Sequence, residues 1–508
     1  MARGARPPRR ADPARAACLA GAIRSSGRGV NENLYALIQR AAARAGATPV
    51  FVEDGETRLT YDRLDAAVGG WARALAARGA RPGDRIVVQV EKSVKNALLY
   101  LASLRAGLVY VPLNTAYTAA ELAYFIEDAE PALVIAPGHL DLAELAGEAT
   151  PGEFETVARA ADDLAAILYT SGTTGRSKGA MLTHRNLSSN ALVLKDYWRW
   201  RPGDVLIHAL PIYHVHGLFV ALHGALLNGS TMLWHKDFDA EAVIADLPKA
   251  TVLMGVPTFY VRMLACEILT REAAANMRLF VSGSAPLLES TFAAFEARTG
   301  HRILERYGMT EAGMICSNPY EGARVPGTVG FLLPGVEARV ADDRGRELPR
   351  GEPGVLEIKG PNLFAGYWRN PDKTAEAMRA DGYFITGDVA TMAADGRVAI
   401  VGRAKDLIIA GGLNIYPKEI ELAIDAVPGV GESTVIGVPH PDLGEGVVAI
   451  VTRADPSLDE TAVLAGCADL ARFKQPRRIV FVDALPRNAM GKVQKAALRE
   501  TYRELFSR

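Results

Sequence analysis

Apolar and polar positions follow one another in a way that predicts helices and strands in turn from about Asn31 onward. A helical face is indicated by four apolar residues at steps of three or four, namely Leu64, Val68, Trp71 and Leu75. Farther along, apolar runs typical of strands at 85–90 and 109–113 flank a helical segment at 94–105. Because a strand, a helix and a strand follow in this order, we expect parallel strands joined by a right-handed crossover.

The segments after residue 204 indicate that the chain folds into several structural units. A second alternating series covers 204–281, and short strands separated by Gly and Pro turns fill 327–401. We therefore predict the α/β class: a large N-terminal region of stacked αβ sheets with a small β-rich subdomain, followed by a small, mobile α+β domain. The predicted boundaries are a disordered or targeting-like extension at 1–30, an N-terminal domain at 31–402 and a C-terminal domain at 403–508.

Charge and cysteine content narrow the class of protein. The 508 residues include 57 basic and 58 acidic side chains, for a net charge of −1. This balance excludes a protein bound to nucleic acid or anionic lipid mainly by its overall charge, so we expect neither partner. The four cysteines, Cys18, Cys266, Cys316 and Cys467, fit neither a disulfide framework nor a zinc signature, which favours a reducing, cytoplasmic compartment.

An apolar stretch and the N-terminal thirty residues both bear on where in the cell the protein is located. The longest apolar stretch, 218–234, is interrupted by polar residues and is short for a membrane span, so a buried helix followed by a turn is predicted. Residues 1–30 are rich in Arg and contain one acidic residue, Asp12. This composition fits an unstructured start, and it also fits a transit peptide, in which case the compartment is the mitochondrial matrix.

The strongest chemical signal is the segment 170–179, which reads TSGTTGRSKG after an apolar strand. Glycines let backbone N–H groups approach an anion, hydroxyls add donors, and Lys178 and Arg176 add positive charge. A Walker A loop is excluded, because it would need Gly at Ser177 and Ser or Thr at Gly179. The segment predicts a polyphosphate-binding loop, with a plain polar loop as the alternative.

With this loop the sequence resembles the adenylate-forming superfamily of acyl-CoA synthetases, adenylation domains and luciferases, over nearly all residues from Asn31 onward. Five further segments agree with that superfamily in order: PIYH at 211–214, ERYGMTE at 305–311, YFITGD at 383–388, GRAKD at 402–406 and PRNAMGK at 486–492. The resemblance implies a two-step reaction: a carboxylate attacks the α-phosphate of ATP, and the thiol of CoA then displaces AMP from the acyl-adenylate. ATP, Mg²⁺ and CoA are the implied ligands.

The resemblance also implies roles for individual residues. Lys492, Glu311 and Thr310 would be catalytic, and Glu311 would also bind Mg²⁺. The implied ATP and AMP ligands are Thr170, Ser171, Gly172, Thr173, Thr174, Gly175, Lys178, Ala285, Glu305, Arg306, Tyr307, Asp388 and Arg403. Lys405 matches the hinge, and Gly411 and Gly412 would lie beside the pantetheine arm of CoA. The alternatives are a solvated surface lysine for Lys492, a helix cap for Glu311 and an Asx turn for Asp388.

Within the superfamily, the segments HALPIYHVHGLF, VLMGVPTFYVRML, VSGSAPLL, LERYGMTE and LPRNAMGKVQK resemble malonyl-CoA synthetases. A dicarboxylic acid needs a fixed cation for the carboxylate that does not react. Arg262 is the candidate, because it shares a predicted helix face with Phe259 and Met263; an exposed helix arginine is the alternative. Ser284 and His214 would join it. If the segment is a strand, His214 and His216 face the same side.

Other functions stay open. The apolar run from Ala312 to Cys316 leaves room for methylmalonate or another small acid. A monocarboxylate ligase and a stand-alone adenylation module that loads a carrier protein are further alternatives. A non-catalytic nucleotide sensor is disfavoured, because it would not need Lys492. A lysine acetylase is a possible regulatory partner, since acetylation of Lys492 would remove its charge.

Overall fold

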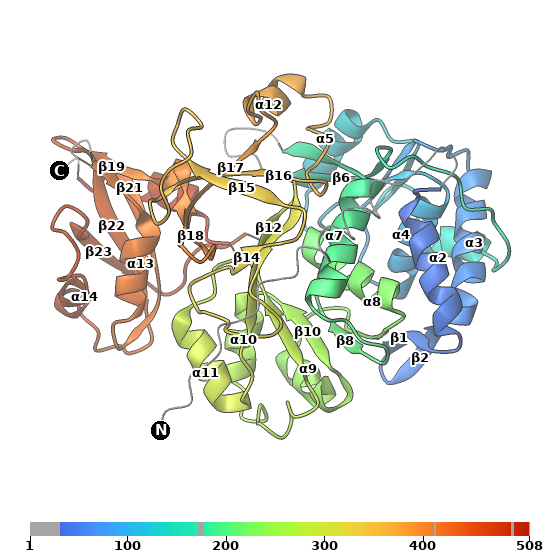
Figure 1. The fold of residues 1–508 in the computed structure, drawn as a ribbon, viewed down its shortest axis with the longest axis horizontal. Coiled ribbons are helices and arrows are strands. Elements are labelled where there is room, and N and C mark those ends of the chain that lie inside the picture. The colour runs from blue at the N-terminus through green and yellow to red at the C-terminus, as the bar shows by residue number, and fades with distance from the viewer. Residues whose placement is uncertain (1–30, 171–176, 411–412, 489–491, 507–508) are drawn as a thin grey trace.

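The computed structural model describes residues 31–170, 177–410, 413–488 and 492–506, which form four β-sheets with surrounding helices (Figure 1). The largest sheet has nine strands in the order β14-β13-β12-β11-β10-β8-β9-β1-β2. Its strands are β1 (Pro49–Glu53), β2 (Glu56–Thr60), β8 (Val205–His208), β9 (Thr231–Trp234), β10 (Val252–Gly255), β11 (Leu279–Ser282), β12 (Leu304–Met309), β13 (Gly313–Ser317) and β14 (Phe331–Leu332). Strands β9, β8, β10, β11 and β12 pair in parallel, which confirms the predicted series at 204–281.

A second sheet has the order β5-β3-β4-β6-β7. It consists of β3 (Arg85–Val88), β4 (Val109–Pro112), β5 (Leu133–Ile135), β6 (Leu164–Thr170) and β7 (Lys178–Thr183). Strands β3 and β4 pair in parallel on either side of α4 (Val94–Arg105), as the sequence predicts. Strand β7 runs antiparallel to β6, so the predicted phosphate loop connects two paired strands.

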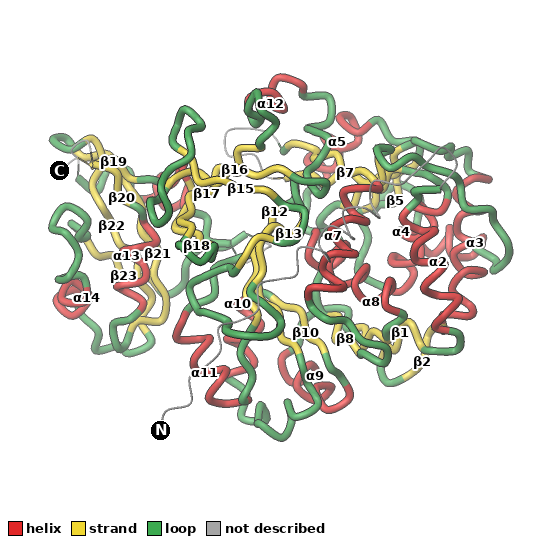
Figure 2. The backbone as a smooth tube through the Cα atoms, in the orientation of Figure 1, coloured by secondary structure: helices red, strands yellow, loops and turns green. Residues whose placement is uncertain are grey.

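Helices pack between the two large sheets and over their outer faces (Figure 2). The helices before residue 384 are α2 (Leu34–Ala45), α3 (Tyr61–Ala77), α4, α5 (Ala119–Ala129), α6 (Leu142–Glu148), α7 (His184–Tyr197), α8 (Leu222–Asn228), α9 (Ala240–Asp246), α10 (Pro257–Leu264), α11 (Glu289–Thr299) and α12 (Pro371–Glu376), with a π-helix at His216–Ala221 and a 3-10 turn at Leu247–Lys249. Helix α7 contacts strands of both sheets. It begins directly after β7 through a capping box between Thr183 and Asn186, which ties the phosphate-loop strand to the core.

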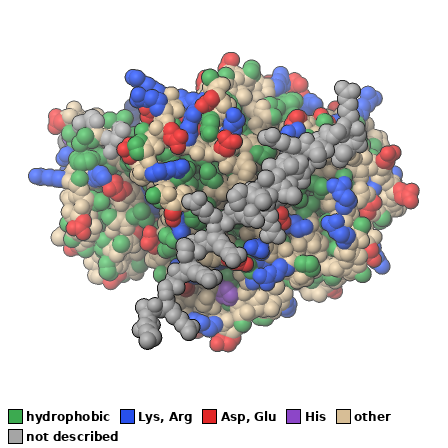
Figure 3. Space-filling view, viewed as in Figure 1, with side chains coloured by type: hydrophobic (Ala, Val, Ile, Leu, Met, Phe, Trp, Pro, Cys, Tyr) green, Lys and Arg blue, Asp and Glu red, His purple; other side chains and the backbone are tan. Residues whose placement is uncertain are grey.

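The apolar stretch at 218–234 is buried, as predicted. It forms the end of the π-helix, helix α8, a left-handed turn at Gly229 and strand β9. Within the described part of the chain, none of the helices is both long and apolar enough to cross a membrane. Charged side chains of both signs are scattered over the face shown in Figure 3, in line with the near-zero net charge.

The β-rich unit predicted at 327–401 contains an antiparallel sheet of β15 (Glu337–Ala341), β16 (Gly354–Lys359), β17 (Phe384–Met392) and β18 (Val398–Arg403). After a 3-10 turn at Ala404–Asp406, the chain forms β19 (Ile408–Ala410), β20 (Leu413–Ile415), α13 (Pro417–Asp425), β21 (Val430–His440), β22 (Gly444–Arg453), α14 (Glu460–Gly466), β23 (Arg478–Val482) and α15 (Lys495–Thr501). The buried apolar clusters change between Ile400 and Ile408, so the C-terminal unit has cores of its own. The α/β class with a smaller α+β C-terminal unit is confirmed.

Candidate active site

Residues from segments far apart in the sequence meet around Asp388, in strand β17. Asp388 is 3 % exposed. Its Oδ2 accepts a hydrogen bond from the Tyr307 hydroxyl at 2.5 Å, and its Oδ1 lies 2.7 Å from Nε of Arg403. The predicted alternative of an isolated Asx turn is wrong, because Asp388 lies within a paired strand. A carboxylate oriented from two sides is suited to accept the hydroxyls of a ribose.

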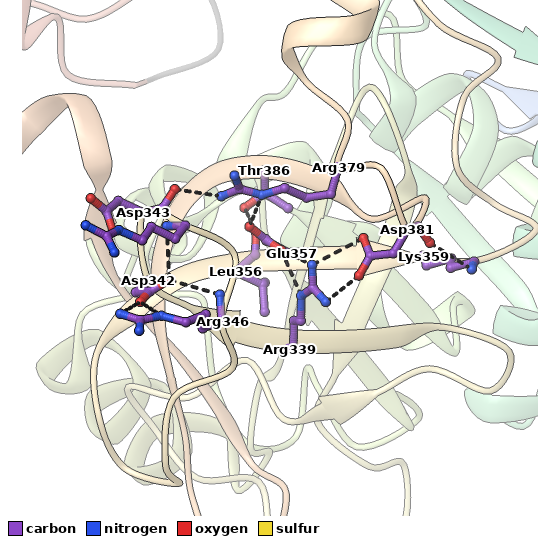
Figure 4. Close-up of polar contacts among 11 residues, drawn as sticks. Arg339, Asp342, Asp343, Arg346, Leu356, Glu357, Lys359, Arg379, Asp381 and Thr386 are labelled. Atoms are coloured by element: carbon purple, nitrogen blue, oxygen red, sulfur yellow. Dashed lines mark hydrogen bonds and ion pairs between the residues drawn. The ribbon is translucent and has the colours of Figure 1, made fainter.

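A buried charge network stiffens the sheet that carries Asp388 (Figure 4). The fully buried Glu357 of β16 pairs with Arg339 at 2.8 Å and with Arg379 at 2.7 Å. Arg339 also contacts Asp381 at 2.6 Å. Because Glu357 would be a buried charge without a partner if both arginines moved away, this network resists local rearrangement.

Glu311 lies in the turn between β12 and β13 and is 7 % exposed. The predicted alternative of a helix cap is wrong, because a strand follows. The Tyr367 hydroxyl donates to Oε1 of Glu311 at 3.0 Å, and burial raises the pKa of this carboxyl. Among the described residues, no three His, Cys, Asp or Glu side chains form a metal cage. The buried carboxylate beside the Thr310 hydroxyl fits Mg²⁺, which prefers oxygen ligands and usually binds phosphates and waters as well.

Lys492 reaches the same region from the C-terminal unit. Its loop is closed by Lys492 N–H donating to Oδ1 of Asn488 at 3.0 Å and by Gln494 N–H donating to the Pro486 carbonyl at 2.8 Å. Lys492 remains accessible to solvent, yet desolvation and then the charge of Arg403 lower its pKa. Desolvation and the charge of Lys492 together lower the pKa of His214 to about 3. The charge of Arg403 thus acts on Lys492, and the charge of Lys492 acts on His214.

A group of buried polar side chains lies beneath this region, around Arg306. Arg306 is 3 % exposed, and its Nε and Nη2 atoms have no hydrogen-bond partner in the described ranges. Its guanidinium packs on Gly283, where an added Cβ would lie 2.3 Å from Cζ. Ser282 Oγ and both ring nitrogens of His216 are likewise buried without a described partner. Burial lowers the pKa of Arg306 to about 9, and burial and Arg306 lower that of His216.

The neighbouring Glu305 is also buried and incompletely bonded. Its Oε1 accepts from the Leu287 N–H at 3.3 Å, and its Oε2 has no partner among the described residues. Desolvation raises the pKa of Glu305 to about 7. Together, Glu305, Arg306 and their neighbours are donors and acceptors without partners, as expected where a polar ligand binds.

The residues predicted to bind the second carboxylate of the substrate differ in burial and in local structure. Phe259 and Met263 are buried while Arg262 is exposed, so Arg262 does not share their buried face. Ser284 adopts a left-handed conformation with φ +70° directly after Gly283, and Ala285 follows it. His214 and His216 do not lie in a strand, because His216 begins the π-helix and His214 precedes it.

The remaining predicted residues are only partly described. Thr170 ends β6, and its hydroxyl donates to the Lys178 carbonyl at 3.4 Å. Ser171, Gly172, Thr173, Thr174, Gly175, Gly411 and Gly412 lie outside the described residues. Lys405 is exposed in the 3-10 turn, and its neighbour Asp406 pairs with Arg499 of α15 at 2.8 Å.

Sequence reasoning missed Tyr367, Ser282 and a cavity of about 700 Å³ at the carboxyl ends of β3 and β5. Lys92, Lys95 and Lys236 line this cavity, together with Glu53, Glu91 and Asp141. Lys92 is buried and donates to the carbonyls of His208 and His235, whereas Lys95 and Lys236 are exposed. The EKS sequence at 91–93, directly after a predicted strand, was the available signal.

A large α/β region in which a hydroxyl- and glycine-rich segment connects two paired strands, followed by a smaller α+β unit with cores of its own, is the architecture of enzymes that activate carboxylates with ATP. The chain belongs to the AMP-binding enzyme family, which matches residues 38–368, with the AMP-binding enzyme C-terminal domain at 419–492. It is an AMP-forming acyl-CoA ligase.

Individual relatives support this class and differ in the acid they name. ATP-bound MatB from Rhodopseudomonas palustris is 52 % identical, with a TM-score of 0.90 over 94 % of this chain and 100 % of that chain. A malonate–CoA ligase of Mus musculus is 35 % identical over 83 % of each chain. A feruloyl-CoA synthase of an Amycolatopsis species is 35 % identical over 92 % of this chain and 98 % of the relative.

Proposed function

We propose that this enzyme ligates malonate to CoA, forming malonyl-CoA, AMP and pyrophosphate through a malonyl-adenylate. The observation that carries this proposal is the buried Arg306 with two unpaired donor atoms, beside Gly283 and Ser284. A buried guanidinium with free N–H groups binds a carboxylate in a charge-assisted, bidentate manner. The family resemblance implies that Arg306 binds ATP; we assign it instead to the carboxylate that does not react.

The names of the relatives support malonate as one of several possibilities. Malonate–CoA ligases and a feruloyl-CoA synthase are equally similar at 35 % identity. A feruloyl or long acyl chain would place apolar surface against Arg306 and leave its donors unpaired, at a cost of about 1–3 kcal/mol for each buried group. Methylmalonate presents the same carboxylate with one more methyl group, so it stays an alternative substrate within this proposal.

In the adenylation step, two anions must meet, so the site acts by positioning and by charge neutralisation. Lys492 would neutralise charge between the attacking carboxylate and the α-phosphate, and Thr310 would donate to that phosphate. Asp388 would accept the ribose hydroxyls, and Tyr307 would pack against the adenine. Glu311 would bind Mg²⁺, which supplies further charge neutralisation when bound.

In the second step the thiol of CoA needs a path and its nucleotide needs cations. The cavity offers volume at the carboxyl ends of parallel strands, where nucleotides bind in α/β sheets. Its lining mixes three carboxylates with lysines, of which the exposed Lys95 and Lys236 are the candidates for phosphate contacts. We assign the cavity to the nucleotide part of CoA. Lys236 lies 4.0 Å from Glu91, and both side chains are exposed in the lining of the cavity.

The test compares Arg306→Met with Arg262→Met in pyrophosphate exchange and thioester assays, using malonate, methylmalonate, butyrate and ferulate. We expect Arg306→Met to lower kcat/KM for malonate by about 100-fold, because the distal carboxylate loses its charge partner, while butyrate is used as well as or better than before. A loss shared equally by every acid, with weaker ATP binding, would instead restore Arg306 to the ATP site. A malonate-specific loss in Arg262→Met alone would assign the clamp to the exposed arginine.

A further inference from the structure

Residues 361–368, between β16 and α12, connect the phosphate-loop hairpin with the Glu311 turn (Figure 1). On one side, the backbone of this segment bonds to β7, through Ala365 N–H to the Met181 carbonyl at 2.9 Å and Trp368 N–H to the Gly179 carbonyl at 2.7 Å. On the other side, Phe364 N–H donates to the Glu311 carbonyl at 2.7 Å. The segment therefore fixes the distance between two elements that both contribute to the site.

Tyr367 in this segment contacts a charged group with each part of its side chain. It is 8 % exposed. Its hydroxyl donates to the Glu311 carboxylate at 3.0 Å, and Nζ of Lys178 lies 5.0 Å from the centre of its ring. The ring is packed edge-on against Phe364 at 4.9 Å, and its backbone N–H donates to the Thr374 hydroxyl at 2.9 Å. Packing and the backbone thus hold the ring in addition to its two contacts with charged groups.

We propose that Tyr367 is a positioning residue for adenylation, which keeps the ammonium of Lys178 and the carboxylate of Glu311 apart and oriented toward the magnesium-bound triphosphate. Lys178 and Glu311 carry opposite charges and form no ion pair with each other in the described ranges. A cation over a tyrosine ring is attracted by the face of the ring, while the hydroxyl orients the carboxylate in the ring plane. Without this separation the two groups would be free to neutralise each other, and neither would then be available to the substrate.

This inference rests on the proposed role of Glu311 in Mg²⁺ binding, so the experiment includes Glu311→Gln as a reference. ATP affinity is measured by calorimetry on the full chain, with excess Mg²⁺ and with EDTA. Tyr367→Phe removes the hydroxyl and keeps the ring. We expect it to reduce the Mg²⁺-dependent gain in ATP affinity by about tenfold, the size of one hydrogen bond to a charged group, and to leave affinity in EDTA unchanged. Tyr367→Leu removes both contacts and should lower affinity in both conditions.

Two controls separate positioning from loss of structure. Tyr61→Phe removes a buried hydroxyl that donates to the Ser230 carbonyl at 2.8 Å, far along the chain from the site, and should change neither affinity. Thioester formation from supplied acyl-AMP, which does not use the triphosphate, should stay at wild-type level in Tyr367→Phe.

The outcomes assign each failure to a cause. If Glu311→Gln abolishes the Mg²⁺-dependent gain and Tyr367→Phe does not reduce it, the positioning role is refuted. If Glu311→Gln retains the Mg²⁺-dependent gain in ATP affinity, the assignment of Glu311 to Mg²⁺ is refuted, and with it the basis of the role of Tyr367. If Tyr367→Phe loses affinity equally with and without Mg²⁺, or loses thioester formation as well, the tyrosine has only a structural role.

Discussion

Replacing Glu305 with glutamine should stabilise the protein, and the stabilisation should grow as pH rises from about 5 to about 8. Glu305 is buried, and its desolvation raises the pKa of this carboxyl from 4.5 to about 7 in the folded chain. Its Oε2 has no hydrogen-bond partner among the described residues, and the Leu287 N–H and the charges of Lys418 and Arg306 offset only part of the cost of ionisation. Glutamine has nearly the same shape, retains an acceptor for the Leu287 N–H and carries no charge.

The sign and size follow from the two pKa values. Between pH 4.5 and 7 the unfolded chain loses its proton at this position more readily than the folded chain, so stability falls as pH rises through this window. Integrating the two titrations gives a penalty of about 1 kcal/mol near pH 5 and about 3 kcal/mol near pH 8. The advantage of Glu305→Gln over wild type should therefore increase by about 2 kcal/mol across this range.

Thermal unfolding of wild type and variant at the two pH values, without ligands, measures this difference. Glu127→Gln, an exposed position on α5, is the matched control and should shift the midpoint equally at both pH values. A difference between wild type and Glu305→Gln that is the same near pH 5 and near pH 8 would refute the reasoning. A variant less stable than wild type near pH 8 would show that the carboxylate has a strong charge partner in solution.

Two further predictions concern the two half-reactions. Lys492→Ala should abolish pyrophosphate exchange but spare thioester formation from supplied acyl-AMP, because its ammonium is placed among the adenylation groups; equal loss of both would contradict this role. Lys95→Ala should raise KM for CoA several-fold with exchange unchanged, since removal of one exposed cation weakens binding of a phosphate by about 1 kcal/mol. Lys249→Ala, an exposed lysine outside the cavity, is the control for that measurement, and an unchanged KM for CoA in Lys95→Ala would contradict the assignment of the cavity.

Local patterns were sufficient for much of the architecture. The helix at 94–105 and the parallel strands around it are where periodicity and the Gly107 terminator place them, because neighbouring residues alone decide which face is apolar. The apolar strand before the phosphate loop was also predicted, and the structure has β6 there, paired with β7. Local reasoning left the structure around His214 and His216 open, and His216 begins a π-helix rather than lying in a strand.

The sequence by itself determined the class of chemistry, because a phosphate loop and a C-terminal lysine segment are encoded in short, contiguous motifs. Only the tertiary structure decided which groups share one space: Asp388 with Tyr307 and Arg403, and Tyr367 with Glu311. It also decided which arginine is buried with free donors, since Arg306 and Arg262 are both plausible in the sequence. Burial and pairing depend on residues brought together from distant parts of the chain, and no local pattern records them.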